Sequence, residues 1–138
     1  MSFSTPKLTV DAVIILSGKI VLIERKNAPY QGKYALPGGF VDVGETTEKA
    51  VEREVNEETG LTIEIVKLLG VYSEPSRDPR GHTVSIVYLV LGSGIPKANT
   101  DAKGVQLFDI QNIPEMAFDH NLIIENARSD IYGILSRM

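Results

Sequence analysis

The sequence contains no cysteine. A disulfide framework, a thiolate nucleophile and a cysteine-type zinc site are therefore all excluded, and any metal chemistry must use oxygen ligands and two histidines. No apolar run approaches the ~18–20 residues that span a bilayer, and residues 1–7 lack the basic-then-apolar order of a signal peptide. We therefore expect a cytoplasmic protein with no membrane partner.

The chain also lacks a strong excess of either charge. Its formal net charge is −4, which gives no broad attraction for nucleic acid. The acidity is concentrated in residues 45–58, where six glutamates oppose Lys49 and Arg53. A local cluster of carboxylates predicts a local chemical role more than a general surface property.

Length and apolar content fit one ordered domain over residues 1–138, because 138 residues bury enough apolar surface for a core and 43% of them are hydrophobic. The patterns predict strands at 8–16, 20–24, 34–36, 63–72, 83–91 and 105–108, and a tight turn at 37–39. They predict helices at 46–59, capped by Thr46 or Thr47 and ended by Gly60, and at 121–135. The expected class is α/β in the mixed α+β sense, with a mixed sheet packed between helices.

The first predicted helix carries three carboxylates on one narrow face. Each helical residue advances by ~100°, so Glu54, Glu57 and Glu58 share that face. Like charges at this spacing destabilise a helix by roughly 0.2–0.5 kcal/mol per pair, which a bound dication would offset. Hard oxygen ligands favour Mg²⁺ or Mn²⁺ over zinc. The alternative for the glutamates by themselves is a solvated acidic helix face.

The residues around these glutamates form a longer pattern. It consists of Gly39, five residues, Glu45, seven residues, and then Arg53-Glu54-Val55-Asn56-Glu57-Glu58-Thr59-Gly60-Leu61. Seven fixed identities coincide at a given start by chance with a probability on the order of 10⁻⁸. The pattern resembles the box of the Nudix hydrolases, and the approach 34–39 resembles the strand and turn that precede it.

This resemblance implies a Nudix-type α/β/α sandwich and hydrolysis of the pyrophosphate bond of a nucleoside diphosphate linked to another group. The metal ligands that it implies are the Gly39 carbonyl, Glu54, Glu57 and Glu58, with Mg²⁺ or Mn²⁺ as the cofactor. Arg53 and Glu45 lie off the face of the three carboxylates, so we assign them to orienting and holding the loop and helix of the catalytic unit. The candidates for the water-activating base are Glu54 and Glu57, with Glu115 and Asp119 as alternatives from a late loop.

The substrate must be inferred from residues outside the box. Residues 70–83 resemble the corresponding stretch of ADP-ribose pyrophosphatases, which cleave ADP-ribose to AMP and ribose 5-phosphate and are commonly homodimers. Arg77 and Arg80 are candidates for binding phosphate or ribose, because guanidinium groups suit anionic oxygens. Tyr34 or Tyr30 can stack on adenine, although aromatic residues near strands more often pack internally. We expect His82 and His120 to form structural hydrogen bonds.

Two other functions remain open from the sequence. The first is hydrolysis of dinucleoside polyphosphates or nucleoside triphosphates, which the box does not distinguish from hydrolysis of ADP-ribose. The second is a non-catalytic ADP-ribose-sensing domain, because some Nudix-like regulators share a similar stretch at 78–81. The intact carboxylates disfavour the second function, and so does a length that leaves no room for a DNA-binding module.

Overall fold

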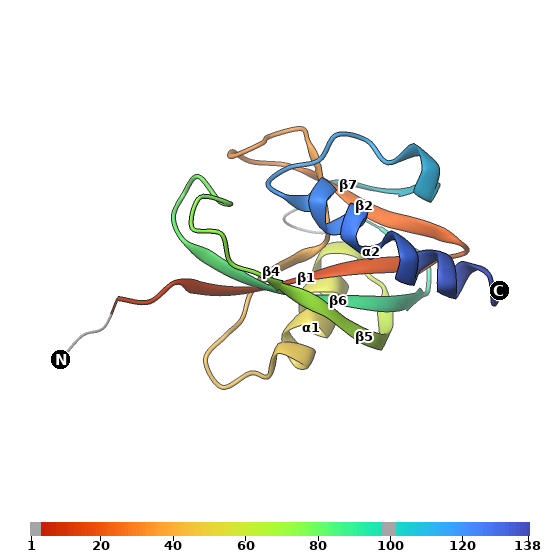
Figure 1. The fold of residues 1–138 in the computed structure, drawn as a ribbon, viewed down its shortest axis with the longest axis horizontal. Helices are drawn as coiled ribbons and strands as arrows, with labels where there is room; N and C mark the ends of the chain where they lie inside the picture. Colours follow the sequence, from red (N-terminus) through yellow and green to blue (C-terminus); the bar gives the residue numbers. More distant parts are fainter. Residues whose placement is uncertain (1–3, 98–101) are drawn as a thin grey trace.

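A mixed β-sheet lies between two helices in the computed structural model, which describes residues 4–97 and 102–138 (Figure 1). The elements, in chain order, are β1 (Lys7–Leu16), β2 (Lys19–Arg25), β3 (Tyr34–Ala35), β4 (Gly38–Phe40), α1 (Thr47–Thr59), β5 (Thr62–Tyr72), β6 (Thr83–Ser93), β7 (Ala102–Phe108), a 3₁₀ turn (Ile110–Asn112) and α2 (His120–Leu135). This arrangement confirms the predicted fold class. None of the helices in the described residues is long and apolar enough to cross a membrane.

The central strand of the sheet is β1. It pairs in parallel with β6 and antiparallel with β2 and β4, so the sheet is mixed. The main strand order is β3-β2-β1-β6-β5, and β7 pairs antiparallel with β2. The parallel pairing joins the start of the chain to its second half, and it brings the loop between β5 and β6 beside Gly38 and Gly39.

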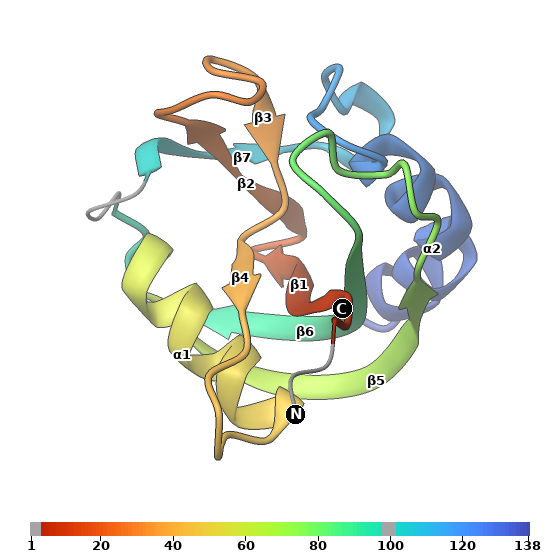
Figure 2. The same cartoon turned by 90° about the vertical axis from the view of Figure 1, so that its left-hand side faces the viewer.

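The two faces of the sheet are both buried, which explains the continuous apolar run in β1. Side chains alternate across a strand, so Val10 and Ala12 pack with α1 on one face while Val13 and Ile15 pack with α2 on the other. Figure 2 shows α1 and α2 on opposite sides of the strands. The sheet thereby fixes the distance between two helices that are far apart in the sequence.

Both ends of α1 follow from local sequence. The side chain of Thr46 accepts a hydrogen bond from the Lys49 amide at 3.1 Å, which selects Thr46 over Thr47 as the cap. Gly60 ends the helix with φ of 75°, and its amide donates to the Asn56 carbonyl at 2.9 Å. The position of the acidic helix was therefore predictable.

The structure corrects the prediction of a turn at residues 37–39. Gly38 and Gly39 lie in strand β4, where they pair with Asp11 and Val10 of β1. A Cβ at Gly38 would overlap the Val10 carbonyl oxygen and lie 2.6 Å from Asp11 Oδ1, so only glycine allows this approach. The glycines therefore serve close strand pairing, not chain reversal. Several element boundaries also differ from the predicted ones by one to three residues; β7, for example, begins at Ala102 and α2 at His120.

The helix end gives a stability prediction. Gly60→Ala should lower the free energy of unfolding by ~1–2 kcal/mol, because a Cβ is strained at positive φ. Gly133→Ala is the matched control: it lies inside α2 with open space around it, and should raise stability by ~0.5–1 kcal/mol. Urea unfolding measures both changes. A shift in the same direction for both variants would contradict the assignment of Gly60 as a left-handed cap.

Candidate active site

A cleft opens beside β4, bounded by the end of β2, the C-terminal half of α1 and the loop between β5 and β6. Its part above α1 has a volume of about 480 Å³, within the usual range for small-molecule sites. The residues that line this part include Arg25, Gly38, Gly39, Phe40, Glu54, Glu58 and Arg80. A narrower part continues between β1 and the segment before α2. The catalytic motif therefore faces a cleft of suitable size for a nucleotide.

The two glycines of the motif hold its glutamates against β4. A Cβ on Gly39 would lie 2.5 Å from the Glu54 carboxylate carbon, so the absence of a side chain lets the carboxylate reach the backbone. The Gly38 amide donates to Glu58 Oε1 at 2.8 Å. Glu54 and Glu58 thus share one wall of the cleft with the backbone of both glycines.

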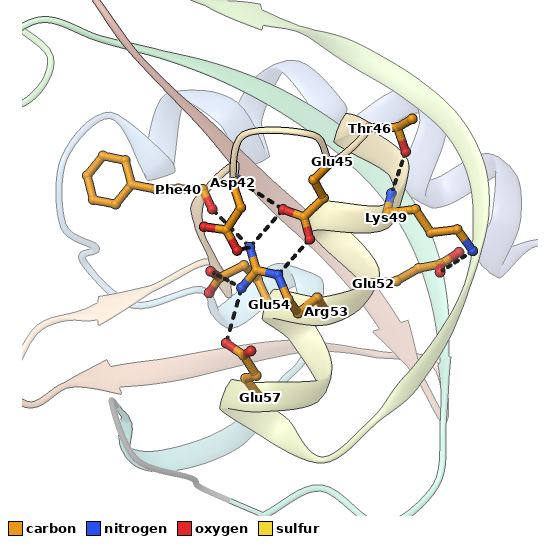
Figure 3. Close-up of polar contacts among 9 residues, drawn as sticks. All are labelled: Phe40, Asp42, Glu45, Thr46, Lys49, Glu52, Arg53, Glu54 and Glu57. Carbon is orange, nitrogen blue, oxygen red and sulfur yellow. Dashed lines mark hydrogen bonds and ion pairs between the residues drawn. The ribbon is translucent and has the colours of Figure 1, made fainter.

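Arg53 forms the centre of an ion-pair network on α1 (Figure 3). Its guanidinium binds Glu45 in bidentate fashion, with Nε to Oε2 at 2.7 Å and Nη2 to Oε1 at 3.0 Å. Nη1 donates to Glu54 at 2.8 Å and to Glu57 at 3.2 Å, and Nη2 donates to the Phe40 carbonyl at 3.0 Å. One side chain therefore ties the loop after β4 to the acidic helix, which supports the holding role predicted for Arg53 and Glu45.

The charges of this network reinforce each other. Hydrogen bonds from Arg53 and from the Asp42 amide lower the pKa of Glu45 to about 2. The hydrogen bonds to Glu45 raise the pKa of Arg53 above its ordinary value. Both groups are therefore charged throughout the physiological pH range.

The three carboxylates of the motif share a helix but not one point in space. Glu54 and Glu58 face the cleft, whereas the side chain of Glu57 is 54% exposed and turns to Arg53. No group of three histidine, aspartate or glutamate side chains in residues 4–97 and 102–138 is gathered closely enough to hold an ion. The candidate ligand atoms suit a hard cation, since all of them are oxygens. To reach an ion beside Glu54 and Glu58, the Glu57 side chain would have to break only its exposed ion pair with Arg53. Exposed ion pairs contribute about 0–1 kcal/mol to stability.

Arg77 lies in the cleft wall, but its guanidinium is hydrogen-bonded to other side chains of the protein. Nε and Nη2 donate to the two oxygens of Asp119 at 2.9 and 2.8 Å, and Nη1 donates to Thr83 Oγ1 at 2.9 Å. Only 5% of its side chain is exposed. This geometry makes Arg77 a structural link between its loop and Asp119, at the start of α2, and substrate binding by Arg77 stays a prediction. The same pairing occupies Asp119, one of the alternative bases.

Arg80 is placed as a substrate contact should be. Its side chain is 50% exposed, lines the cleft and is oriented by Asp78, which accepts from Nε at 3.1 Å and from Nη2 at 2.8 Å. Arg80 and Arg25 both contact the ring of Phe118. The distance from guanidinium to ring centroid is 5.0 Å for Arg25 and 5.6 Å for Arg80. Burial and the nearby Arg80 cation lower the pKa of Arg25. The pair forms a cationic wall opposite the glutamates.

The predicted aromatic contacts lie elsewhere. Tyr34 packs edge-on against Phe108 at 5.1 Å, its hydroxyl donates to Gln106 at 2.8 Å, and it does not line the described clefts. Tyr30 contacts the edge of Phe118 at 4.9 Å. The position of Tyr34 in β3 directs its ring into the packing of the sheet, and its assignment to substrate binding stays a prediction that these contacts do not support.

Comparison with known proteins identifies the family. Residues 5–127 match the sequence model of the NUDIX domain. The chain belongs to the Nudix family. It is 54% identical over 123 residues to an ADP-ribose pyrophosphatase of Methanocaldococcus jannaschii, an alignment that covers 88% of this chain and 72% of that protein.

Solved structures give the same assignment. A MutT/nudix family protein from Enterococcus faecalis superposes with a TM-score of 0.85 at 34% identity, over 96% of this chain and 64% of that one. The NUDIX domain of Shewanella oneidensis NrtR, cocrystallised with ADP ribose, superposes with a TM-score of 0.80 at 33% identity, over 94% of this chain and 90% of that one. The Nudix fold is thus shared along nearly the whole chain.

A buried polar cluster beneath the Nudix cleft escaped the sequence analysis. His120 Nδ1 accepts from the Leu36 amide at 3.0 Å, so Nε2 carries the proton of the neutral ring and lies 3.8 Å from Asp11 Oδ1. Ser85 donates to the other oxygen of Asp11. Burial lowers the pKa of His120 to about 3 and raises that of Asp11 to about 7. The prediction that His120 forms a structural hydrogen bond is confirmed, but its partners come from distant segments that no local pattern could indicate.

Burial of His120 predicts a dependence of stability on pH. The unfolded chain binds a proton at histidine below pH ~6.5, whereas the folded protein resists it down to about 3. The contribution of His120 to stability should therefore fall as the pH falls through that window, by up to roughly 1.4 kcal/mol per pH unit. Asp11, whose pKa is raised to about 7, contributes in the opposite direction, so the comparison is between wild type and a variant that lacks only the histidine. His120→Asn keeps an acceptor near the Leu36 amide and should show a shallower fall in urea unfolding. The control, His82→Asn in an exposed loop, should retain the wild-type curve, and an unchanged slope in His120→Asn would refute the assignment.

Proposed function

We propose that this Nudix protein hydrolyses ADP-ribose to AMP and ribose 5-phosphate with the help of Mg²⁺ or Mn²⁺. The observation that carries the proposal is the placement of Glu54 and Glu58 beside the backbone of Gly38 and Gly39, on one wall of a cleft whose opposite wall is cationic. Similarity to the M. jannaschii ADP-ribose pyrophosphatase supports this substrate.

A bound dication supplies charge neutralisation at the diphosphate and acidifies a water molecule. The residues that would hold it are Glu54, Glu57, Glu58 and the carbonyl of Gly39. Arg25 and Arg80 bind the anionic oxygens of the diphosphate from the opposite side, where they hold the substrate and stabilise the charge that develops on the leaving phosphate. Water adds to one phosphorus as the bond to the bridging oxygen breaks, which yields two phosphomonoesters.

Glu54 is our candidate for the base that removes the proton from the attacking water. It lines the cleft with a side chain that is 16% exposed, while Glu57 lies outside the lining of that cleft. The late-loop alternatives are less suitable, because Asp119 is held by Arg77 and Glu115 is 80% exposed beside Lys33. Arg53 orients the Glu54 carboxylate through its 2.8 Å hydrogen bond. Arg53 and Glu45 therefore act as positioning residues.

A sensing domain that binds ADP-ribose without cleaving it is the second candidate. The ADP ribose cocrystal of the S. oneidensis NrtR domain favours this alternative. Both functions use the same cleft, so release of AMP distinguishes them.

We also infer a homodimer. The inference is supported by the open edge of the sheet at β5, where Leu68 and Val71 are 52% and 56% exposed. A small-molecule nucleotide is the proposed substrate, and the weak net charge still predicts no nucleic-acid partner.

Removal of metal tests the catalytic proposal. Release of AMP from ADP-ribose should stop in excess EDTA and return with Mg²⁺ or Mn²⁺, as followed by chromatography. Glu58→Gln should lower kcat by roughly 100-fold or more while the fold persists, because glutamine keeps an acceptor for the Gly38 amide but loses the charge. Glu57→Gln should also lower kcat. Full turnover in EDTA would disprove metal dependence, and binding without AMP release would favour the sensing function.

The two arginines of the β5–β6 loop should respond differently to truncation. Arg80→Ala should lower kcat/KM for ADP-ribose by roughly 10- to 150-fold, equivalent to about 1.5–3 kcal/mol for a charged hydrogen bond to phosphate. Arg77→Ala should act mainly by lowering the melting temperature, because it breaks a buried link to Asp119. Arg137→Ala, beyond the end of α2, controls for loss of a cation. If Arg80→Ala retained wild-type kcat/KM, the cationic wall would have no role in binding.

A further inference from the structure

The cleft has three adjoining parts, and the parts differ in chemistry. The narrow middle part, of about 90 Å³, is too small for a nucleobase and contains Gly38, Gly39 and Glu58. Two larger hollows adjoin it, of about 480 and 550 Å³. ADP-ribose also has three parts, a diphosphate between a nucleoside and a ribose. Gly38, Gly39 and Glu58 line both the middle part and the hollow of about 480 Å³, and Glu54 lines that hollow. With the diphosphate at these residues, as the proposed function requires, the remainder of that hollow and the hollow of about 550 Å³ are left for the terminal ribose and the base.

The hollow above α1 suits a sugar. Apart from Glu54 and the residues that it shares with the middle part, it is lined mostly by polar and charged residues, which are Lys26, Asn27 and Asp42. Such groups can donate to and accept from the hydroxyls of ribose. They offer little apolar surface for the flat face of a purine.

The hollow beyond Phe40 has the opposite character. It lies between residues 4–7 and 80–83, where Pro6 and Phe40 supply apolar surface. Lys7 lines it as a nitrogen donor, and adenine presents ring nitrogens that accept hydrogen bonds. His82 also lines it, with Nε2 bonded to the Ser73 carbonyl oxygen at 3.0 Å. Its carboxylate, Asp78, is paired with Arg80. This combination of apolar surface and donors fits a nucleobase.

Phe40 is the residue placed to stack on that base. It follows Gly39 directly and borders all three parts of the cleft. Although it is a large apolar residue, it is 43% exposed. The bond from Arg53 to its carbonyl fixes the backbone, and Figure 3 shows the ring directed away from the carboxylates around Arg53. A fixed, exposed ring offers a stacking surface with little loss of conformational freedom on binding.

Phe118, the other phenylalanine in the cleft lining, does not serve this role. The guanidinium groups of Arg25 and Arg80 lie 5.0 and 5.6 Å from its ring centroid, and Tyr30 makes an edge contact with it. Phe40 has one such cation, Lys7, whose Nζ lies 5.5 Å from its ring centroid, so fewer groups of the protein occupy the Phe40 ring. Phe118 instead positions the arginines of the cationic wall.

We propose that Phe40, with the hollow between residues 4–7 and 80–83, forms the adenine subsite of the cleft. The diphosphate then runs across Gly38 and Gly39, and the terminal ribose occupies the hollow above α1. Phe40 is thereby a specificity-determining residue that contacts substrate, in the role that the sequence had suggested for Tyr34. This proposal depends on the proposed function only for the orientation of ADP-ribose, that is, for which end of the molecule lies in which hollow.

Binding of the two products tests this subsite without hydrolysis. Isothermal titration should show that Phe40→Ala weakens the affinity for AMP by roughly 5- to 150-fold, the equivalent of ~1–3 kcal/mol for stacking of one base. The affinity for ribose 5-phosphate should stay unchanged. Phe40→Tyr, which keeps the ring, should restore AMP binding. Tyr132→Ala is the matched control, because Tyr132 is 40% exposed on α2 and lines a different hollow.

Kinetics on ADP-ribose separate this proposal from the proposed function. Phe40→Ala should raise KM with a smaller change in kcat, and a melting curve should report an intact fold. Equal affinity of wild type and Phe40→Ala for AMP would overturn the adenine subsite, even if ADP-ribose is hydrolysed. Conversely, AMP binding that depends on Phe40 would support the subsite even in a protein that fails to cleave ADP-ribose. Equal loss of AMP and ribose 5-phosphate binding would also overturn it, since that pattern indicates general damage to the cleft.

Discussion

The geometry of the active site depends on the ion pairs of Arg53. This guanidinium joins Glu45 before the helix, the Phe40 carbonyl at the end of β4, and Glu54 and Glu57 on α1. Each bond is charge-assisted, and together they hold an exposed loop against a helix whose glutamates otherwise repel each other. The network stabilises the acidic helix without metal and directs Glu54 into the cleft. Glu54 therefore lies at the cleft surface with its charge paired with Arg53.

A second anchor organises the opposite wall. Asp119 and His120, at the start of α2, bind Arg77 of the β5–β6 loop and the Leu36 amide before β4. Both contacts are largely buried, so they hold the loop and the strand in fixed positions where water cannot compete. This second anchor explains why the end of the chain contributes to a site whose motif lies in its first half. Phe118, directly before this anchor, contacts the guanidinium groups of both Arg25 and Arg80.

The catalytic unit was largely predictable, and its surroundings were not. The helix, its Thr46 cap and its Gly60 end follow from residues within one or two turns of one another. The orientation of Tyr34 was not predictable, because a ring in β3 can face the sheet or the cleft, and strand pairing decides which. The ion pair of Arg77 was not predictable for a similar reason, because its partner, Asp119, is 42 residues away in the chain.

The sequence alone determined the family, the acidic helix and the residue types that can hold a divalent cation, because each is encoded by short-range spacing within residues 39–61. Tertiary structure decided which of those carboxylates face the cleft, which arginine is exposed to substrate and which is consumed by an internal ion pair. It also brought Arg25, Phe40 and Phe118 into one cleft from separate segments. Such contacts depend on the parallel pairing of β1 with β6 and on the docking of α2 against the sheet. They join residues far apart in the chain, and no local periodicity records them.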